Sequence, residues 1–361
     1  MALSRRVLNR AFLRRQLLDE RASVGVGEAV RHLFGLQSQQ PMPPYFALWS
    51  RVADFAPERL VELLVNREVV RATLMRCTVH LVTADDCLAL RPAVAPVIDR
   101  QLTGNPGRAA ELKKIDDLGA LAAAAREYLK EPRGAKELGA HLAAAWPQCK
   151  PAELARIAQF VVPVLQTPPR GVWGKSAQPA WTAIEDWLDR PLERPAQVGA
   201  ALRRYLAAYG PASVADMQKW SGLGGLAEVV AGLDLRTYRD EAGRVLYDLP
   251  DATLPAEDAP APVRFLAEYD SAILSHADRA RIIDAAHVPA VVAKNGIVKG
   301  TFLVDGFVRG VWSEAGGSVS VTPFVGLSAI ETEAVEAEGA ALAAFAAPGR
   351  ATPRVTIQSA Q

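Results

Sequence analysis

The sequence predicts an α+β fold in which three tandem winged-helix modules precede a C-terminal β-barrel-like domain. Amphipathic helices followed by a strand-rich hairpin recur three times, and beyond residue 262 the chain changes to alternating strands with Asn-Gly and Asp-Gly turns. With 361 residues, 50% of them hydrophobic, the chain can bury several cores. The expected divisions are modules at 1–105, 106–190 and 191–255, a β domain at 256–350 and a disordered tail at 351–361.

The first module begins with helices. Ser4 can cap a helix that runs to about Glu20, because the apolar residues of this segment form one stripe with arginines on the other side. Further helices are expected at 27–34 and 56–66. A proline cluster at 41–44 forbids continuation of the second helix.

A β-hairpin is predicted over residues 69–83. If Met75 and Arg76 form its turn, Arg71 faces His80, which places basic groups on one surface. Helices followed by such a β-wing describe a winged helix.

The same order of elements recurs twice. The helices expected in the second and third modules span residues 118–129, 135–145, 151–164, 195–209, 213–220 and 225–231. Strand-like segments at 172–181 and 235–249 follow them as the wings.

The C-terminal part has a different pattern. Residues 251–262 are rich in Pro, Ala and Asp and form a connection. Strands at 291–307 and 310–323 predict a small barrel or curled sheet, and a helix is expected at 331–346.

Composition excludes several classes of protein. Lys and Arg total 41 and Asp and Glu total 40, so only a local basic face could hold a phosphate backbone. No apolar stretch is long enough for a membrane span, and we expect a cytoplasmic, nucleoid-associated monomer. The three cysteines and five histidines lack metal-ligand spacing, so neither a metal nor another cofactor is predicted.

The densest local oddity is the run from Gly35 to Pro41, which contains Gln37 and Gln39. If Gly35 ends the helix and the next residues extend, the two amides point to the same side. One interpretation is that they cap the helix or satisfy loop backbone groups. The other is that they converge on a reaction centre.

Several motifs resemble one known family, the winged-helix DNA glycosylases related to the enzyme that unhooks azinomycin crosslinks. The matching segments are Leu3-Ser4-Arg5-Arg6-Val7-Leu8-Asn9-Arg10, Gly35-Leu36-Gln37-Ser38-Gln39, Leu48-Trp49-Ser50-Arg51, Arg71 to Leu81, Pro168 to Gly174, Ser275-His276-Ala277-Asp278-Arg279, Val304-Asp305-Gly306 and Gly310-Val311-Trp312. The likeness covers nearly the whole chain. It implies three tandem winged helices and a C-terminal β-barrel that together form a concave DNA-binding surface.

The resemblance also implies the catalytic residues. The family signature is Gln, an apolar residue, then Gln, which corresponds to Gln37 and Gln39 here, whereas the middle residue is Ser38. The implied activity is monofunctional DNA glycosylase action on double-stranded DNA carrying alkylated purines, with bulky adducts and interstrand crosslinks as candidate substrates. Genome repair and self-resistance of an antibiotic producer both fit.

The substrate makes this chemistry plausible for amides. N7- or N3-alkylated purines are already cationic, so they leave without a strong general acid. The protein then needs only to place a water and to present carbonyl dipoles to the developing positive charge. Gln37 and Gln39 can act as acceptors, although neither is a general base of useful pKa. No lysine adjoins them, which favours simple hydrolysis over Schiff-base lyase action.

Candidate DNA contacts are basic and polar side chains in three segments. They are Arg5, Arg6 and Arg10; Arg71, Arg76 and His80 on the first wing; and His276, Asp278, Arg279 and Arg281 in the β domain, where the resemblance suggests a hairpin that probes the DNA groove. The alternatives are a solvated face for the arginines and a structural ion pair between Asp278 and an arginine.

Two other functions stay open at this point. One is a non-catalytic winged-helix DNA-binding protein, either a transcription regulator or a lesion sensor. The other is an enzyme that acts on RNA or free nucleosides.

Overall fold

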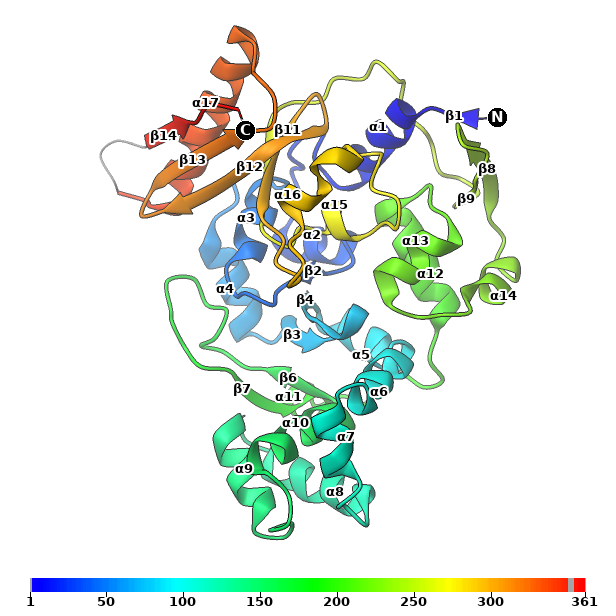
Figure 1. Ribbon diagram of the computed structural model, residues 1–361, viewed down its shortest axis with the longest axis vertical. Helices are drawn as coiled ribbons and strands as arrows, with labels where there is room; N and C mark the ends of the chain where they lie inside the picture. The colour runs from blue at the N-terminus through cyan, green and yellow to red at the C-terminus, as the bar shows by residue number, and fades with distance from the viewer. Residues whose placement is uncertain (1, 350–353, 361) are drawn as a thin grey trace.

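The computed structural model describes residues 2–349 and 354–360. In Figure 1 the middle helices α7 to α10 form the lower end of an elongated molecule, and the N-terminal helices and the C-terminal sheet form the upper part. Within the described ranges, no helix combines the length and the apolar character that crossing a bilayer requires.

Four helices open the chain. They are α1 (Arg5–Arg15), α2 (Val26–His32), α3 (Pro43–Trp49) and α4 (Pro57–Val65). The Ser4 hydroxyl accepts the Val7 N–H at 3.1 Å, so the predicted cap is confirmed. The helix ends earlier than Glu20, since Leu17 has a φ of 55°. Helix α3 was not predicted, because Pro43 and Pro44 were interpreted only as helix breakers, whereas they lie in the first turn of α3, where proline is favoured. Helix α2 itself ends at His32, well before these prolines.

The predicted hairpin is present, but its expected register is wrong. Strands β3 (Val69–Thr73) and β4 (Val79–Thr83) are antiparallel, with Arg71 opposite Leu81 and His80 opposite Ala72. The turn includes the short 3-10 helix η1 (Met75–Cys77) and is longer than two residues. The longer turn shifts the pairing by one residue and turns the side chains of one strand to the other face.

One sheet joins the first two predicted modules. Its strand order is β2-β4-β3-β6-β7-β5, and its other members are β2 (Leu36–Gln37), β5 (Arg133–Gly134), β6 (Val164–Gln166) and β7 (Ala180–Ala183). Its helices are α5 (Ala84–Ala93), α6 (Ala95–Thr103), α7 (Pro106–Leu112), α8 (Leu118–Tyr128), α9 (Ala135–Ala143) and α10 (Pro151–Val161). The helices predicted near 118, 135 and 151 are therefore present. The predicted strand at 172–181 is wrong for most of its length, since only residues 180–183 pair.

The third segment also has helices before a hairpin. Its elements are α11 (Ile184–Leu188), α12 (Val198–Tyr209), α13 (Val214–Ser221), α14 (Leu226–Ala231), β8 (Arg236–Asp240) and β9 (Val245–Asp248). The N-terminal strand β1 (Ala2–Leu3) adds to β8 in parallel. The extreme N-terminal segment is thus part of a sheet made mainly by residues 236–248.

The predicted C-terminal barrel is wrong, because the sheet is open. Its order is β10-β11-β12-β13-β14, and its two edge strands do not pair with each other. The elements are β10 (Arg264–Leu266), α15 (Ser271–Leu274), η2 (Ala285–His287), α16 (Val288–Val291), β11 (Gly300–Val304), β12 (Phe307–Ala315), β13 (Ser318–Pro323), α17 (Ala329–Ala346) and β14 (Arg354–Ile357). Helix α17 contacts β10, β13 and β14 and so covers the sheet where a barrel would close on itself.

The predicted disorder of the tail is also wrong for residues 354–357. These residues pair in parallel with β13, with Val355 opposite Val319. Residues 351–353 and 361 of the predicted tail lie outside the described residues.

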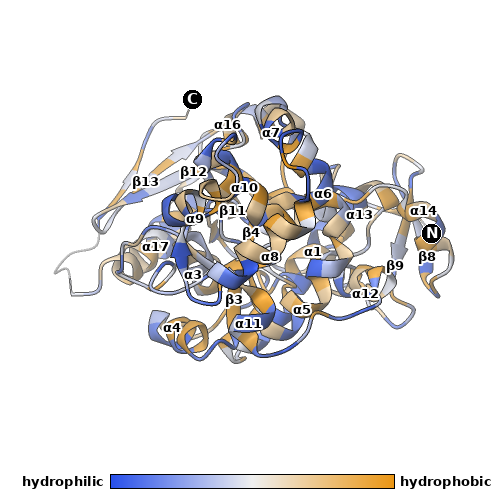
Figure 2. Ribbon diagram, turned by 90° about the horizontal axis from the view of Figure 1, so that it is seen from below, coloured by the Kyte–Doolittle hydropathy of each residue, from blue (hydrophilic) through white to orange (hydrophobic). Residues whose placement is uncertain are grey.

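A buried ion pair joins the N-terminal helices to the C-terminal domain. The Arg51 guanidinium donates to both carboxylate oxygens of Asp270 at 2.9 and 2.7 Å, and both side chains are fully buried. The largest apolar cluster likewise mixes distant segments, from Phe12 to Val308. Figure 2, seen from below, shows hydrophobic residues on helices such as α8 and α10, which lie at the lower end of Figure 1. The parts of the chain therefore form one packed body.

Candidate active site

The segment that contains both glutamines leaves α2 through a sharp reversal. Phe34 and Gly35 both have positive φ, 54° and 103°. A Cβ on Gly35 would lie 2.9 Å from a methyl group of Val82, so the backbone conformation and the packing both favour glycine. After the reversal, β2 pairs antiparallel with β4, with Gln37 opposite His80.

Both amide oxygens are hydrogen-bonded to the β3–β4 hairpin. The Oε1 of Gln37 accepts from the Nη2 of Arg76 at 2.9 Å, and the Oε1 of Gln39 accepts the Val79 N–H at 3.2 Å. The Gln37 side chain is nearly buried, whereas Gln39 is exposed. Because arginine only donates hydrogen bonds, the contact with Arg76 fixes which end of the Gln37 amide is the oxygen.

Ser38 is buried between the two glutamines. Its hydroxyl accepts from the Nε of Arg71 at 2.9 Å, and its carbonyl oxygen accepts from the Nη2 of the same residue at 2.7 Å. The polar residue at the middle position of the motif thus has a polar partner. Arg71 is 1% exposed and pairs with no carboxylate of the described residues. Burial, followed by the charge of Arg170, lowers the pKa of Arg71 to about 10.

Arg76 connects the motif to the third segment. It lies in the η1 turn with a φ of 54°, and its Nη1 donates to the Trp220 carbonyl at 2.6 Å. Burial lowers the pKa of Arg76 to about 10, so it stays charged at neutral pH. Like Arg71, it has no carboxylate partner among the described residues.

His80 is a neutral side chain in this arrangement. Its Nε2 lies 3.3 Å from the Nη2 of Arg76 and its Nδ1 lies 2.9 Å from the Thr78 carbonyl, so Nδ1 carries the proton and Nε2 accepts. Burial and then the charge of Arg76 lower the pKa of His80 to about 3. With both ring nitrogens occupied and no charge, His80 holds the hairpin together and is withdrawn as a phosphate contact.

Comparison with known proteins identifies the family. Residues 30–345 match the model of the family described as DNA glycosylase AlkZ-like. The chain belongs to this family. The resemblance inferred from the motifs is therefore confirmed.

Two individual proteins support the family assignment of this AlkZ-like chain. An interstrand DNA cross-link repair glycosylase from Streptomyces sahachiroi is 28% identical over 179 residues, 47% of this chain and 48% of that protein. The match thus spans about half the length of that relative. The solved structure of Streptomyces sahachiroi DNA glycosylase AlkZ matches with a TM-score of 0.79 at 20% identity, over 99% of this chain and 100% of that one. At this level of identity the likeness shows a common fold.

The arginines of α1 hold the AlkZ-like chain's own C-terminal sheet. Arg6 donates to both carboxylate oxygens of Asp305 at 2.7 and 3.0 Å. Arg10 is 2% exposed and donates to the Asp305 carboxylate, the Asp305 carbonyl at 3.0 Å and the Ala259 carbonyl at 2.7 Å. Arg5 is exposed, and its Nε donates to the Ala280 carbonyl. Of these predicted phosphate contacts, Arg10 is withdrawn because it is buried, as is Arg71 for the same reason.

Asn9 also joins α1 to the C-terminal part of the chain. Its Nδ2 donates to the carbonyls of Arg281 at 2.8 Å and of Gly306 at 2.7 Å. A Cβ on Gly306 would lie 2.5 Å from the Asn9 side chain, so glycine is needed for this close approach.

The polar cluster at residues 276–281 is largely internal. His276 is 2% exposed, its Nε2 donates to the Tyr209 carbonyl at 3.1 Å, and burial lowers its pKa to about 3. Arg281 is buried and donates to the Pro211 carbonyl at 2.8 Å. Asp278 pairs with Arg244, as the structural alternative expected. His276 and Arg281 are therefore withdrawn as DNA contacts, and the partly exposed Arg279 is retained.

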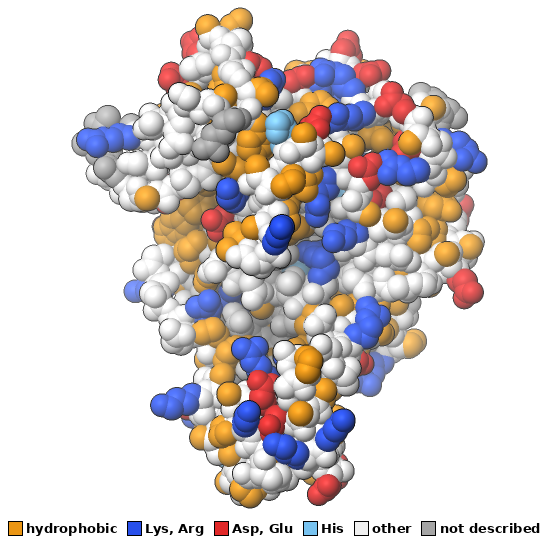
Figure 3. Space-filling model, viewed as in Figure 1, with side chains coloured by type: hydrophobic (Ala, Val, Ile, Leu, Met, Phe, Trp, Pro, Cys, Tyr) orange, Lys and Arg blue, Asp and Glu red, His pale blue; other side chains and the backbone are white. Residues whose placement is uncertain are grey.

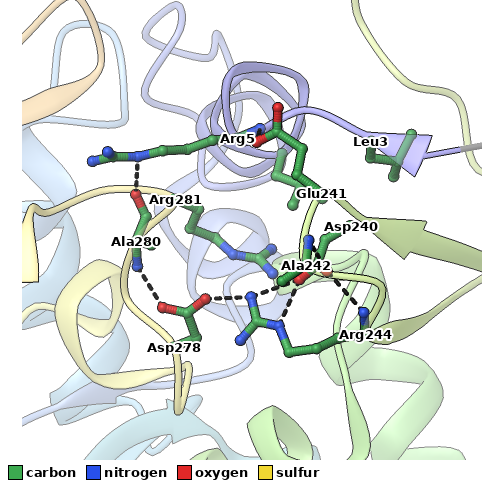
Figure 4. Close-up of a pocket in the computed structure, with 10 residues that line it drawn as sticks. Leu3, Arg5, Asp240, Glu241, Ala242, Arg244, Asp278, Ala280 and Arg281 are labelled. Atoms are coloured by element: carbon green, nitrogen blue, oxygen red, sulfur yellow. Dashed lines mark hydrogen bonds and ion pairs between the residues drawn. The ribbon is translucent and has the colours of Figure 1, made fainter.

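A cavity of about 220 Å³ lies beside this cluster, between β1, α1 and the β8–β9 turn. Figure 4 shows that Arg244 pairs with both Asp240 and Asp278 in this cavity. Arg244 pairs with Asp240 at 2.6 Å and with Asp278, and Arg5 contacts the Ala280 carbonyl. None of its lining residues belongs to β2, β3 or β4, so it is separate from the glutamines.

Sequence reasoning missed Lys219 near the motif. It is exposed at the end of α13, and burial, then the charges of Arg279 and Arg76, lower its pKa, which places three cations around one region. The packing of α13 against η1 brings Lys219 near Arg76, and the bond from the Ala277 N–H to Asp216 of α13 brings in the segment that carries Arg279. Figure 3 shows Lys and Arg side chains around a hollow between the upper and lower parts of this face. Among the described residues, no three His, Cys, Asp or Glu side chains form a metal-binding group.

Proposed function

We propose that this chain is a monofunctional DNA glycosylase that hydrolyses the N-glycosidic bond of cationic N-alkylated purines, with a water placed by Gln37 and Gln39. One observation carries the proposal: among the described residues, no carboxylate hydrogen-bonds to Gln37, Ser38 or Gln39, and the nearby imidazole is neutral and fully occupied.

A site of this kind suits a leaving group that is already activated. An unmodified purine needs protonation before it departs, and neither amides nor a His80 with both nitrogens occupied can supply the proton. An N7- or N3-alkylated purine carries its positive charge from the start and departs as a neutral base. The chemistry left to the protein is then the placement of water and the stabilisation of charge on the sugar.

The amides keep capacity for this task although both are bonded to the hairpin. A carbonyl oxygen has two lone pairs, and the contacts with Arg76 and with the Val79 N–H occupy one on each residue. The remaining lone pairs can accept from an attacking water. Arg76 fixes Gln37 in place, so the cost of ordering its amide is met before substrate binds.

Double-stranded DNA would lie across the face that carries the hollow in Figure 3. Lys219 and Arg279 are our candidates for phosphate contacts, together with Arg5 and Arg6. The three successions of helices and hairpins would act as winged helices in a monomer. We extend the proposal to bulky adducts and interstrand crosslinks, because Gln39 lies on the surface and a relative is named a cross-link repair glycosylase.

The test compares base release from a duplex that contains N7-methylguanine. The variants are the Gln37→Ala, Gln39→Ala double variant and, as a matched control, Gln40→Ala, which removes an exposed neighbouring amide. We expect alkali-labile strand breaks with the native chain and with Gln40→Ala, at a rate above spontaneous depurination, and none above background with the double variant. Equal release by all three would exclude the two glutamines from the reaction.

The same assay addresses the second function left open by the sequence. A chain that binds undamaged duplex selectively and produces no abasic site would be a regulator or lesion sensor. Strong competition by duplex DNA over RNA and free nucleosides would exclude action on those substrates.

A further inference from the structure

A second cavity lies close to the glutamine motif, between α3 and the C-terminal sheet. Its volume is about 210 Å³, which is below the usual range for drug-sized ligands and suits one flat ring system. Its walls include Met42, Pro43, Phe46 and Trp312.

The aromatic wall is held in a fixed position. The indole Nε1 of Trp312 donates to the Leu266 carbonyl at 2.8 Å, and its ring lies 5.9 Å from that of Phe46. A Cβ on Gly300 would lie 2.8 Å from the indole, so glycine allows Trp312 to lie flat against β11. A rigid aromatic face of this kind accepts a planar ligand at little cost in ordering.

The charge of the cavity is negative. Its ionisable lining residues are Glu268 and Glu314, and no Lys or Arg lines it. Glu268 is exposed and forms no ion pair with a described residue, and the partial burial of its carboxyl raises its pKa. One oxygen of Glu314 accepts the Gly317 N–H at 2.6 Å and the other has no such partner among the described residues. A phosphate would be repelled here, whereas a cation would meet two carboxylates and the face of an indole.

The cavity is near the proposed reaction centre. Met42 and Pro43 follow Gln39 by three and four residues, which limits the Cα separation of Gln39 and Met42 to about 11 Å. Helix α3, which carries Phe46, contacts β2, which carries Gln37. The glutamine motif and one wall of the cavity are therefore neighbours in the chain and in the fold.

We propose that the cavity lined by Phe46, Trp312 and Glu268 binds the positively charged ring of an alkylated purine, or the flat cationic part of a larger adduct. The inference rests on the proposed glycosylase function and names the site that selects its substrate. Arg71 and Arg76 beside the motif are positively charged and repel a cation. The negatively charged cavity, not the motif, therefore attracts the cationic base.

Binding of free bases tests the cavity without any catalysis. The whole chain is titrated in a calorimeter with 7,9-dimethyladeninium, a permanent cation, and with 9-methyladenine, a neutral base of nearly the same shape. We expect the cation to bind at least about tenfold more tightly. Glu268→Gln should abolish this preference, and Glu336→Gln, which removes an exposed carboxylate from α17, should keep it. Equal binding of the two bases by the native chain, or equal behaviour of the two variants, would overturn the proposal.

Two further variants separate this inference from the proposed function. Trp312→Phe keeps an aromatic ring and should retain part of the preference, whereas Trp312→Leu should lose it; thermal unfolding of both shows whether the fold is intact. The Gln37→Ala, Gln39→Ala variant should keep the preference for the cation. A native chain that prefers the cation but releases no base would retain the cavity and exclude the glycosylase function.

Discussion

Two sets of buried or half-buried arginines in this molecule differ in their partners. Arg51 pairs with Asp270, and Arg10 pairs with Asp305, so each positive charge is matched where α1 and α3 meet the C-terminal domain. Arg71 and Arg76, on either side of the glutamine motif, bond only to Ser38, Gln37, Trp220 and His80. Arg51 and Arg10 thus join segments through ion pairs, whereas Arg71 and Arg76 hold the motif without a carboxylate partner among the described residues.

The difference has an electrostatic reason. A buried ion pair cancels most of its own field, and its removal costs mainly stability. A guanidinium that leaves water without gaining a carboxylate keeps its field and its desolvation cost. The pKa values of the buried Arg71 and the half-buried Arg76 accordingly fall to about 10. Such residues are common where function requires a charge that stability alone would not favour.

The largest effect is expected from breaking a paired arginine. Arg51→Met leaves the Asp270 carboxylate buried and uncompensated, and we expect the free energy of unfolding to fall by about 3–5 kcal/mol. Denaturant unfolding measures the loss. Base release per folded molecule should be unchanged at low temperature, and adding Asp270→Leu should recover much of the stability. A proportional loss of activity would contradict the division between the two sets.

Replacing an arginine that has no carboxylate partner should instead reduce activity more than stability. Arg76→Leu frees the Gln37 amide, and we expect base release from N7-methylguanine duplex to fall about a hundredfold, as for the loss of one donor that positions a reacting group. Arg100→Leu is the control, because Arg100 also donates to a carbonyl near α13, that of Gly222, but does not contact the motif. If both variants lose activity equally, Arg76 acts through the local fold alone.

Lowering the pH should reduce stability through His80, the neutral partner of Arg76. Its pKa in the folded chain is about 3, below the ordinary 6.5, so the unfolded chain binds a proton there that the folded chain does not. Stability should therefore fall as the pH drops from about 6.5 toward 3, by at most about 1.4 kcal/mol per pH unit for this residue. Unfolding at pH 7, 6 and 5 should show a shallower dependence for His80→Asn. The pKa of His276 is also lowered to about 3, so His276 still contributes to the pH dependence of stability in the His80→Asn variant.

The smallest effect concerns exposed cations. Lys219→Ala should reduce the slope of log K against log salt for duplex binding by about 0.9, because it removes one phosphate contact. Arg6→Ala should change this slope less, since Asp305 already neutralises Arg6, and should cost about 0–1 kcal/mol of stability. Fluorescence anisotropy at several salt concentrations measures both. A larger slope change for Arg6→Ala than for Lys219→Ala would mean that Arg6, not Lys219, contacts a phosphate.

Local sequence predicted much of the secondary structure. Helices α8, α9 and α10, the cap at Ser4 and the β3–β4 hairpin follow from periodicity and turn chemistry, which depend on neighbouring residues. The open C-terminal sheet was not predictable in the same way. Closure depends on whether β10 and β14 meet, and α17 lies across that side of the sheet.

The glutamine motif was visible in the sequence, but its surroundings were not. Gln37 and Gln39 stood out as amides in a place that favours apolar residues. Arg76, the partner of Gln37, follows it by 39 residues, and Trp220 and Lys219 come from another segment. Basic residues near the N-terminus resemble a phosphate-binding face until Asp305 is placed beside them.

The contacts of α1 have a consequence for synthesis of the chain. Asn9 and Arg10 bond to carbonyls of residues 259–306, and β1 needs β8 as its partner. At about 5–20 residues per second, a ribosome needs roughly 15–60 s to make the 300 residues that separate these contacts. During that interval α12 can already pack against α1, but the partners of Asn9 and Arg10 are missing, so part of its surface stays uncovered and open to chaperones that bind nascent chains.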